Sequence, residues 1–244
     1  MQNAPHNKLK TAAAQRQQIR GLHLTFASTT VVELVGRMAL DFVYFDGEHG
    51  CFDWRDLETA CLAAERHGLV AIARVPDPTA ATITRFLDRG VVGLVVPHVQ
   101  SVEEAQSVIE AAYFAPRGRR SFGAGRPGYG VAIGNKPEHL ETENASTCVS
   151  IMIETRRGLE AAHDIAALDG IDYLSFGVND LAQDLGYAGQ PEHPDVVKAV
   201  NACADRIRKV GKPLREDFMK FAWINDVIVT GARQLLDAEH ISSY

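Results

Sequence analysis

Short apolar runs rich in β-branched and aromatic residues alternate with amphipathic helical stretches along the whole chain, and this alternation is what most constrains the fold. The runs are continuously apolar, as expected for parallel strands buried on both faces. Strands that alternate with helices form βαβ units around a parallel sheet. The pattern predicts eight strands: Leu22–Phe26, Phe42–Phe45, Leu69–Arg74, Gly93–Val96, Val149–Ile153, Tyr173–Phe176, Pro213–Arg215 and Val227–Val229.

Eight such units in a chain of 244 residues favour a closed barrel, because a (β/α)8 barrel typically has about 250 residues. We therefore expect an α/β protein with one domain over residues 1–244, a single (β/α)8 TIM barrel, and an N-terminal helix at about 7–19. A doubly wound open sheet is the competing architecture. One long connection, from Tyr113 to Thr147, is rich in glycine and arginine. A loop of that length is either functional or a mobile surface segment.

Charge and composition exclude several classes of function. The net charge of −6 provides no basic footprint for nucleic acid. The longest apolar runs are far too short to cross a membrane, and residues 1–20 lack the apolar core of a secretory signal. The four cysteines show neither zinc-binding nor redox spacing, which is typical of scattered, reduced thiols in a cytosolic protein. We therefore predict a cytoplasmic protein that binds neither nucleic acid nor membrane.

Polar residues that directly follow the predicted strands are the candidate catalytic groups, because barrel enzymes act at the carboxyl ends of their strands. Asp46 and His49 lie in the segment D-G-E-H-G after the second strand. A histidine flanked by carboxylates can be held in one tautomer and act as a general base. Arg74 ends the third strand, where it could bind a carboxylate or a carbonyl oxygen. Taken singly, these residues could equally form a charged surface turn and an ordinary ion pair.

Two carboxylates follow neighbouring strands. Glu154 comes after the fifth strand and Asp180 after the sixth. Adjacent parallel strands lie about 4.8 Å apart, so both side chains could reach one ion, and such a pair suits Mg²⁺ or Mn²⁺. Either acid alone is better explained as a cap of the following helix, but together with Arg74 and His49 the pair favours a metal site. Asp88, in the last turn of a predicted helix, is a fifth candidate, and an ordinary exposed acid is an equal alternative.

Five short motifs of the chain, each at a predicted strand end, resemble motifs of the class II pyruvate aldolases and occur in the same order. They are D-G-E-H-G at 46–50, A-R-V-P at 73–76, V-P-H-V at 96–99, I-E-T-R-R-G at 153–158 and G-x-x-D-L at 177–181. The family includes the 2,4-dihydroxyhept-2-ene-1,7-dioate and 2-dehydro-3-deoxyglucarate aldolases, and macrophomate synthase and the siderophore-type citrate synthases are similar too. The likeness runs from about Leu9 to Gln190.

The resemblance implies a barrel of the phosphoenolpyruvate/pyruvate-binding type. The activity it implies is a metal-dependent aldolase that cleaves or forms a 4-hydroxy-2-oxo acid, to or from pyruvate and an aldehyde. Glu154 and Asp180 would bind a divalent metal, Mg²⁺ first, with Mn²⁺ or Co²⁺ as alternatives. Backbone amides around Gly177, Val178, Asn179 and Asp180 would bind the carboxylate of the oxo acid.

The resemblance also implies roles for the residues at the other strand ends. Arg74 would hold the carbonyl oxygen of the pyruvate unit and stabilise its enolate. His49, supported by Asp46, would be the acid–base group, and Asp88 would support Arg74 or His49, in some cases across a subunit contact. The family further implies a homo-oligomer, commonly a hexamer. No lysine follows any strand in these motifs, so a Schiff-base mechanism has little support.

Two departures from the family pattern leave alternatives open. The sixth-strand motif is G-V-N-D-L where the aldolases more often have G-P-A-D-L, and a proline would fix the backbone where valine does not. After Pro213 the chain continues L-R-E-D-F-M-K-F-A-W-I-N, where relatives have an apolar strand and a recognisable helix. A transferase that condenses an acyl donor with oxaloacetate in the same type of site, and a binding protein on a decayed barrel, are therefore the competing hypotheses.

Overall fold

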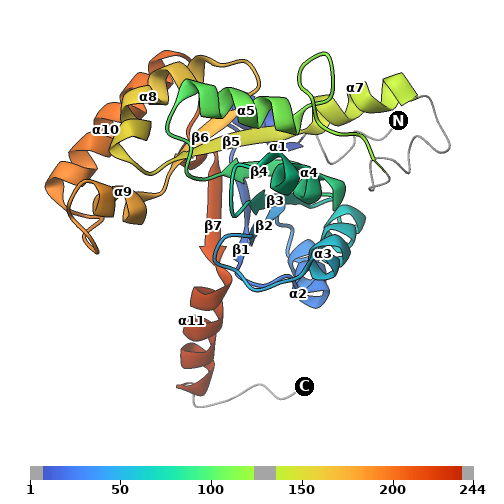
Figure 1. Ribbon diagram of the computed structural model, residues 1–244. Coiled ribbons are helices and arrows are strands. Elements are labelled where there is room, and N and C mark those ends of the chain that lie inside the picture. Colours follow the sequence, from blue (N-terminus) through green and yellow to red (C-terminus); the bar gives the residue numbers. More distant parts are fainter. Residues whose placement is uncertain (1–7, 124–135, 238–244) are drawn as a thin grey trace.

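The computed structural model describes residues 8–123 and 136–237, and in that part of the chain seven parallel strands form one curled sheet (Figure 1). The strand order is β6-β5-β4-β3-β2-β1-β7, so every neighbouring pair from β1 to β6 is also consecutive in sequence. The strands are β1 (Ile19–Leu24), β2 (Phe42–Asp46), β3 (Val70–Arg74), β4 (Gly93–Val96), β5 (Cys148–Ile153), β6 (Tyr173–Phe176) and β7 (Met219–Trp223).

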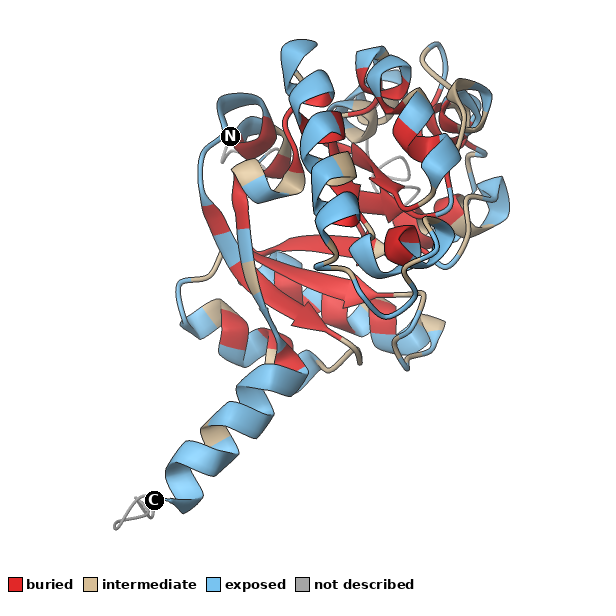
Figure 2. Ribbon diagram, turned by 90° about the vertical axis from the view of Figure 1, so that its left-hand side faces the viewer, coloured by how far each residue is buried: buried red, intermediate tan, exposed pale blue. Residues whose placement is uncertain are grey.

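Most of the helices cover the outer face of the sheet and turn their apolar sides inward (Figure 2). Local capping fixes where several of them begin: Asp53 and Asp56 form a capping box at the start of α3, and the Thr155 hydroxyl accepts a hydrogen bond from Gly158 at the start of α8. Such caps satisfy N–H groups that the helix itself leaves free. The helices are α1 (Lys8–Gln15), α2 (Thr29–Arg37), α3 (Trp54–Arg66), α4 (Ala80–Asp88), α5 (Val102–Ala112), α7 (Lys136–Ser146), α8 (Arg156–Ala167), α9 (Val178–Asp184), α10 (Pro194–Lys209) and α11 (Ile224–Leu236).

The core is divided by the sheet into two apolar clusters, because successive strand side chains point to opposite faces. The larger cluster lies between the outer face and the helices. The smaller one fills the inside of the curl, where Phe42, Ile72 and Tyr173 are fully buried. Leu9 of α1 packs into this inner cluster and is also fully buried. Helix α1 therefore helps to close the inner cluster, which leaves the carboxyl ends of the strands for a site.

The expectation of a closed eight-stranded barrel is wrong, because the sheet is an open half-barrel. Strand β7 pairs with β1, but the described strands β6 and β7 do not pair with each other. A single parallel bridge joins Leu174 of β6 to Leu214, which precedes β7. The predicted strand Pro213–Arg215 is reduced to that bridge and the start of a 3-10 turn, η2 (Arg215–Asp217). The predicted strand Val227–Val229 lies inside α11.

The physical reason is the length of the chain in this region. Only residues 210–218 lie between α10 and β7, which is less than a complete βαβ crossover needs. The apolar triplet at 227–229 belongs to a helix of 13 residues, and a short apolar run cannot by itself distinguish a buried strand from a helix. One βα unit is therefore missing and the barrel does not close.

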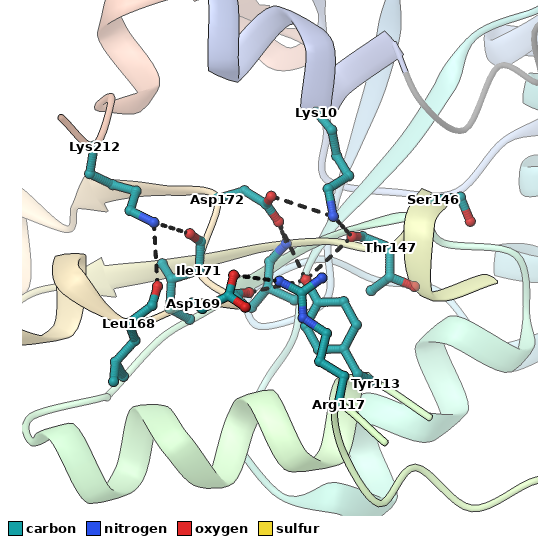
Figure 3. Close-up of polar contacts among 12 residues, drawn as sticks. Lys10, Tyr113, Arg117, Ser146, Thr147, Leu168, Asp169, Ile171, Asp172 and Lys212 are labelled. Atoms are coloured by element: carbon teal, nitrogen blue, oxygen red, sulfur yellow. Dashed lines mark hydrogen bonds and ion pairs between the residues drawn. The ribbon is translucent and has the colours of Figure 1, made fainter. Parts of the chain in front are cut away.

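A polar network stabilises the amino-terminal end of the sheet, opposite the strand ends that carry the candidate residues (Figure 3). Asp172 accepts a hydrogen bond of 2.8 Å from the backbone N–H of Val149 and lies 3.5 Å from the Lys10 ammonium. Lys212 donates to two backbone carbonyl oxygens in the turn between α8 and β6. Burial raises the pKa of Tyr113, whose hydroxyl lies 3.5 Å from Asp172. These contacts satisfy buried polar groups, which predicts a role in stability for this end of the sheet.

The last helix, α11, extends away from the body of the protein (Figure 2). Its apolar side chains Val227, Ile228, Val229, Leu235 and Leu236 are 44–73% exposed. Among residues 8–123 and 136–237 no helix combines the length and the apolar character that crossing a membrane requires. The predicted long connection 113–147 is described only in part: α7 occupies its end, and residues 124–135 lie outside the described residues.

Candidate active site

Asp46 and Arg74 form the centre of the site. They are the last residues of β2 and β3 and are direct partners in the register of the two strands. The Arg74 Nε and Nη2 donate to the two Asp46 carboxylate oxygens at 3.1 and 2.7 Å, a bidentate pair, and Nη1 lies 3.1 Å from Glu48. Burial raises the pKa of Asp46, but the neighbouring His23 and Arg74 outweigh it and hold that pKa well below its usual value. A guanidinium has five N–H groups, so two on Arg74 remain for a ligand.

The turn after β2 is built around the same carboxylate. Asp46 Oδ1 accepts the backbone N–H groups of Glu48 and His49 at 3.2 and 3.1 Å. A Cβ at Gly47 would lie 2.5 Å from the Arg74 carbonyl oxygen, so the close approach of β3 requires glycine there. The His49 imidazole is anchored through its backbone, and its side chain is 65% exposed. This turn presents a solvent-accessible ring beside a guanidinium that Asp46 and Glu48 hold in place.

Glu154 follows β5 and is almost completely buried, with 2% of its surface exposed. Its Oε1 accepts the backbone N–H of His98 at 2.6 Å, whereas Oε2 has no hydrogen-bond partner among the described residues. Burial raises the pKa of Glu154, the contacts with His98 oppose this, and Glu48 and Asp180 add to it; the net shift is upward. A buried carboxylate oxygen without a partner is costly unless a proton or a cation balances it.

Gly177 and Asp180 lie on the side of the site that the unpartnered Oε2 atom of Glu154 faces. Gly177 precedes α9, and a Cβ there would lie 2.5 Å from Glu154 Oε2, so any side chain would occupy the space beside the orphaned oxygen. Asp180 is exposed in the first turn of α9, and its charge is felt by Glu154. Within the described ranges no cluster of three or more histidine, cysteine, aspartate or glutamate residues could hold a metal. Glu154 and Asp180 are therefore the two carboxylates that could hold a divalent cation here, with other ligand positions open to water or substrate.

His98 is a site residue that we did not single out from the sequence. Its ring lies between the Asp46–Arg74 pair and Glu154: Nε2 is 2.9 Å from Glu48, which contacts Arg74, and Nδ1 is 2.9 Å from Glu154. Its backbone φ is 61°, a left-handed conformation that a residue other than glycine adopts only rarely. This conformation places both the ring and the backbone N–H within reach of Glu154. The signal was present in the motif V-P-H-V, whose histidine follows β4.

A cavity of about 470 Å³ opens at these strand ends and continues into the curl of the sheet. Its inner wall is a row of three side chains in register across β7, β1 and β2: Trp223, His23 and Tyr44. The rings of His23 and Trp223 stack with centroids 3.7 Å apart, and those of His23 and Tyr44 are 4.5 Å apart. The lining residues are His23, Tyr44, His49, Arg74, Met152, Phe176, Gly177, Val178, Asn179, Asp180, Arg215, Phe221 and Trp223.

Comparison with known proteins agrees with this geometry. A family model described as HpcH/HpaI aldolase/citrate lyase matches residues 20–214. The chain belongs to this family. It is 31% identical over 209 residues to the hydroxypyruvate/pyruvate aldolase of Roseobacter denitrificans, covering 86% of this chain and 81% of the relative. It is 32% identical over 211 residues to the 4-hydroxy-2-oxovalerate aldolase of Rhodococcus jostii, covering 86% and 80%.

Solved structures of the HpcH/HpaI family are similar as well. The crystal structure of a family protein from Burkholderia cenocepacia superimposes with a TM-score of 0.84 at 26% identity, covering 94% of this chain and 98% of that one. Macrophomate synthase gives a TM-score of 0.78 at 27% identity, covering 94% and 88%. The resemblance to class II pyruvate aldolases and the expected enzyme class, a carbon–carbon lyase, are therefore confirmed.

The structure brings most of the predicted residues of this HpcH/HpaI protein to one place. His49, Arg74 and residues 177–180 line the cavity, and Asp46 and Glu154 contact its wall through Arg74 and Gly177. Asp88 is the exception: it pairs with Arg120 at 2.9 Å and is not part of the lining. Two residues of the inner wall, His23 and Tyr44, lie inside β1 and β2, so they do not follow a strand end as the predicted site residues do. The third, Trp223, ends β7, a strand that the sequence pattern did not predict.

Proposed function

We propose that the protein is a divalent-metal-dependent aldolase that cleaves or forms 4-hydroxy-2-oxo acids, with pyruvate or a close 2-oxo acid as one product and an aldehyde as the other. The observation that carries the proposal is Glu154 Oε2, a buried carboxylate oxygen that has no partner in the described part of the chain, beside Gly177 and within electrostatic reach of Asp180. Membership of an aldolase family supports it.

Glu154 and Asp180 would hold the cation. A bound divalent ion supplies Lewis acidity to the 2-oxo and carboxylate groups of the substrate. The chemistry of the donors supports Mg²⁺, with Mn²⁺ or Co²⁺ as alternatives, since carboxylate oxygens and water suit hard cations. The backbone N–H groups of residues 178–180, at the start of α9, lack partners within the helix and would receive the carboxylate of the oxo acid, as would the Asn179 amide.

Arg74 would stabilise the negative charge that develops on the substrate when the carbon–carbon bond breaks. Cleavage leaves an electron pair on C3 of the oxo acid, delocalised onto the C2 oxygen as an enolate. The two N–H groups of Arg74 that neither Asp46 nor Glu48 occupies would donate to that oxygen. The bidentate contact with Asp46 fixes the plane of the guanidinium in advance, so little reorganisation is needed when charge appears.

His49 would move the proton. In the cleavage direction it removes the 4-hydroxyl proton, directly or through water, and the C3–C4 bond breaks to release the aldehyde. The electron pair of that bond becomes the enolate, and a proton returned to C3 gives the 2-oxo acid. The exposed imidazole at the mouth of the cavity and the backbone anchor on Asp46 support this role. For Asp88, a supporting role across a subunit contact stays a prediction.

The partners proposed are small molecules, a 2-oxo acid and an aldehyde. A homo-oligomer, a hexamer as in the family, is supported by the exposed apolar side chains of α11. A cytoplasmic location stays a prediction from the scattered cysteines.

Pyruvate release from 4-hydroxy-2-oxopentanoate tests the proposal. After treatment with EDTA we expect activity to be lost, and Mg²⁺, Mn²⁺ or Co²⁺ should restore it. Glu154→Ala should be inactive, whereas Glu160→Ala, on the exposed side of α8, should behave as wild type. Activity that survives EDTA or persists in Glu154→Ala contradicts the metal site. Thioester-dependent consumption of oxaloacetate, without aldol cleavage, would favour the transferase instead.

A further inference from the structure

His98 is a residue of the site to which the proposed mechanism gives no role. It comes shortly after β4, and its backbone is left-handed, with a φ of 61°. That conformation is unfavourable for a residue other than glycine, and it persists where the surrounding structure requires it, often at a functional site. The contacts of His98 with Glu154 indicate what the strained backbone achieves.

The backbone and the ring of His98 both approach one oxygen of Glu154. The backbone N–H donates to Oε1 at 2.6 Å, and Nδ1 lies 2.9 Å from the same oxygen. Because Oε1 is held from two directions, the carboxylate cannot rotate freely. The other oxygen, Oε2, then faces Gly177, where a Cβ would lie 2.5 Å from it. His98 therefore determines which oxygen of Glu154 is available to a cation.

The ring of His98 is itself held from its other side by Glu48. Nε2 forms a hydrogen bond of 2.9 Å with Glu48 Oε1, and Glu48 Oε2 lies 3.1 Å from Arg74 Nη1. The His98 side chain is 51% exposed, whereas that of Glu48 is 12% exposed. An exposed side chain can occupy several rotamers, so the contact with a largely buried carboxylate gives the ring one orientation.

These contacts place His98 behind a metal ligand and do not make it a ligand itself. Both ring nitrogens already face carboxylate oxygens. In the described part of the chain, no group of three or more acidic, histidine or cysteine side chains could hold a metal. Residues that contact a metal ligand from behind orient it, and their loss typically lowers metal affinity about 10- to 100-fold.

We propose that His98 is a positioning residue for the cation: its ring, held by Glu48, fixes the carboxylate of Glu154. In that orientation Oε2 faces Gly177 and Asp180, where the ion would bind. This rests on the proposed function, in which Glu154 holds the metal of an aldolase. Two consequences follow. Metal affinity depends on a ring that does not ligate the ion, and Glu48 acts on that affinity through the ring.

Mn²⁺ binding, measured by electron paramagnetic resonance, tests the proposal without turnover. His98→Gly keeps the backbone N–H and suits the left-handed backbone, so it removes the ring alone, and Kd for Mn²⁺ should rise about 10- to 100-fold. His98→Asn, which also tolerates this backbone but has a shorter side chain, should lose affinity by a similar factor. His163→Asn, at an exposed histidine of α8, should bind Mn²⁺ as the wild type does.

Added imidazole then separates the ring from the backbone. In His98→Gly it should recover most of the lost Mn²⁺ affinity, because the missing ring leaves an accessible space between two carboxylates. In the wild type and in His163→Asn it should change nothing. Wild-type affinity in both His98 variants overturns the proposal. A loss in His98→Gly that imidazole does not restore also overturns it, because the backbone and not the ring would then be responsible.

A double-mutant cycle tests the part played by Glu48. Glu48→Gln should weaken Mn²⁺ binding about 10-fold in the wild type, but by no more than about twofold in His98→Gly, where the ring it holds is absent. Equal losses in both backgrounds would mean that Glu48 acts by its charge alone, which overturns the proposal. If Mn²⁺ affinity follows the ring but 4-hydroxy-2-oxopentanoate yields no pyruvate, the positioning role stands and the aldolase function has failed.

Discussion

Replacing Glu154 with glutamine should make the metal-free protein more stable, because it removes a buried charge that, in our proposal, only a bound cation would balance. Glutamine retains the shape of the side chain and an acceptor for the His98 N–H, which lies 2.6 Å from Oε1. It removes a buried negative charge whose second oxygen has no partner among residues 8–123 and 136–237. Burial, Glu48 and Asp180 all favour protonation of this carboxylate. An unsatisfied buried group costs about 1–3 kcal/mol, so we expect a gain of about 1 kcal/mol at pH 8.

The sign of the pH dependence follows from the raised pKa of Glu154. The folded state binds its proton more tightly than the unfolded chain, in which a glutamate titrates near about 4.3. The stabilising contribution of the acid is therefore complete below that value and is lost as the pH rises through the folded-state pKa. The stability advantage of Glu154→Gln over the wild type should open as the pH rises from about 4 to 8 and vanish at the acid end.

Metal should reverse the order of stability. At a concentration of 100 times Kd, a cation that binds only the folded state adds about 2.7 kcal/mol. For a domain of this size each kcal/mol shifts Tm by about 2–4 °C, so Mg²⁺ should raise the wild-type Tm by about 5–11 °C and leave Glu154→Gln unchanged. Thermal melts with EDTA and with Mg²⁺, and with Glu160→Gln as the matched control, measure both effects. A metal-free variant that is less stable than the wild type, yet gains the full Mg²⁺ shift, would refute the reasoning.

Three further substitutions probe the strand ends and the opposite end of the sheet. Gly177→Ala places a methyl group 2.5 Å from Glu154 Oε2; Mg²⁺-dependent activity should fall at least about 10-fold with an unchanged circular dichroism spectrum, and wild-type metal affinity by calorimetry would contradict this. Arg74→Lys keeps the charge but loses the planar donor set, so kcat should fall about 10²-fold; a change in KM alone would assign Arg74 to binding. Asp172→Ala leaves the Val149 N–H without its acceptor and should cost about 1–3 kcal/mol by urea unfolding. Its kcat should not change, and a loss of activity in the folded variant would count against a purely stabilising role.

The central strands could be predicted from sequence because they are buried on both faces. The runs at Phe42–Phe45, Gly93–Val96 and Tyr173–Phe176 match β2, β4 and β6 to within one residue. The first strand begins earlier than predicted, at Ile19, because Arg20 and Gly21 interrupt the apolar pattern. Strands with one exposed face, or with a glycine demanded by a neighbour's close approach, do not have the continuous apolar signature.

The end of the barrel could not be predicted by the same rule. Strand β7 alternates buried or half-buried Met219 and Phe221 with exposed Lys220 and Ala222, so it lacks a continuous apolar run. We expected eight complete units and therefore predicted the last strand at Val227–Val229, which lies inside a helix. The apolar side chains there are exposed, but in sequence they look like those of a buried strand. Closure of the sheet depends on the number of residues between consecutive elements, and local sequence patterns do not report this number.

The residues of the candidate site that could be predicted from the sequence are those that end or directly follow a predicted strand. Asp46 and Arg74 could be placed together because parallel strands bring their carboxyl ends to one edge, and the register confirms it. His23 and Arg215 have no such marker: one lies inside β1 and the other in a turn whose position depends on the missing unit. Their shared cavity is a product of tertiary structure alone.

A crystal of the protein soaked with Mn²⁺ and pyruvate tests the central claim most directly, since manganese can be located by anomalous scattering. We expect one strong anomalous peak about 2.0–2.3 Å from both Glu154 Oε2 and an Asp180 carboxylate oxygen, with pyruvate completing the coordination and its 2-oxo oxygen within hydrogen-bonding distance of Arg74. A peak elsewhere, or Glu154 and Asp180 turned apart with pyruvate bound, would contradict the metal site on which the aldolase proposal depends.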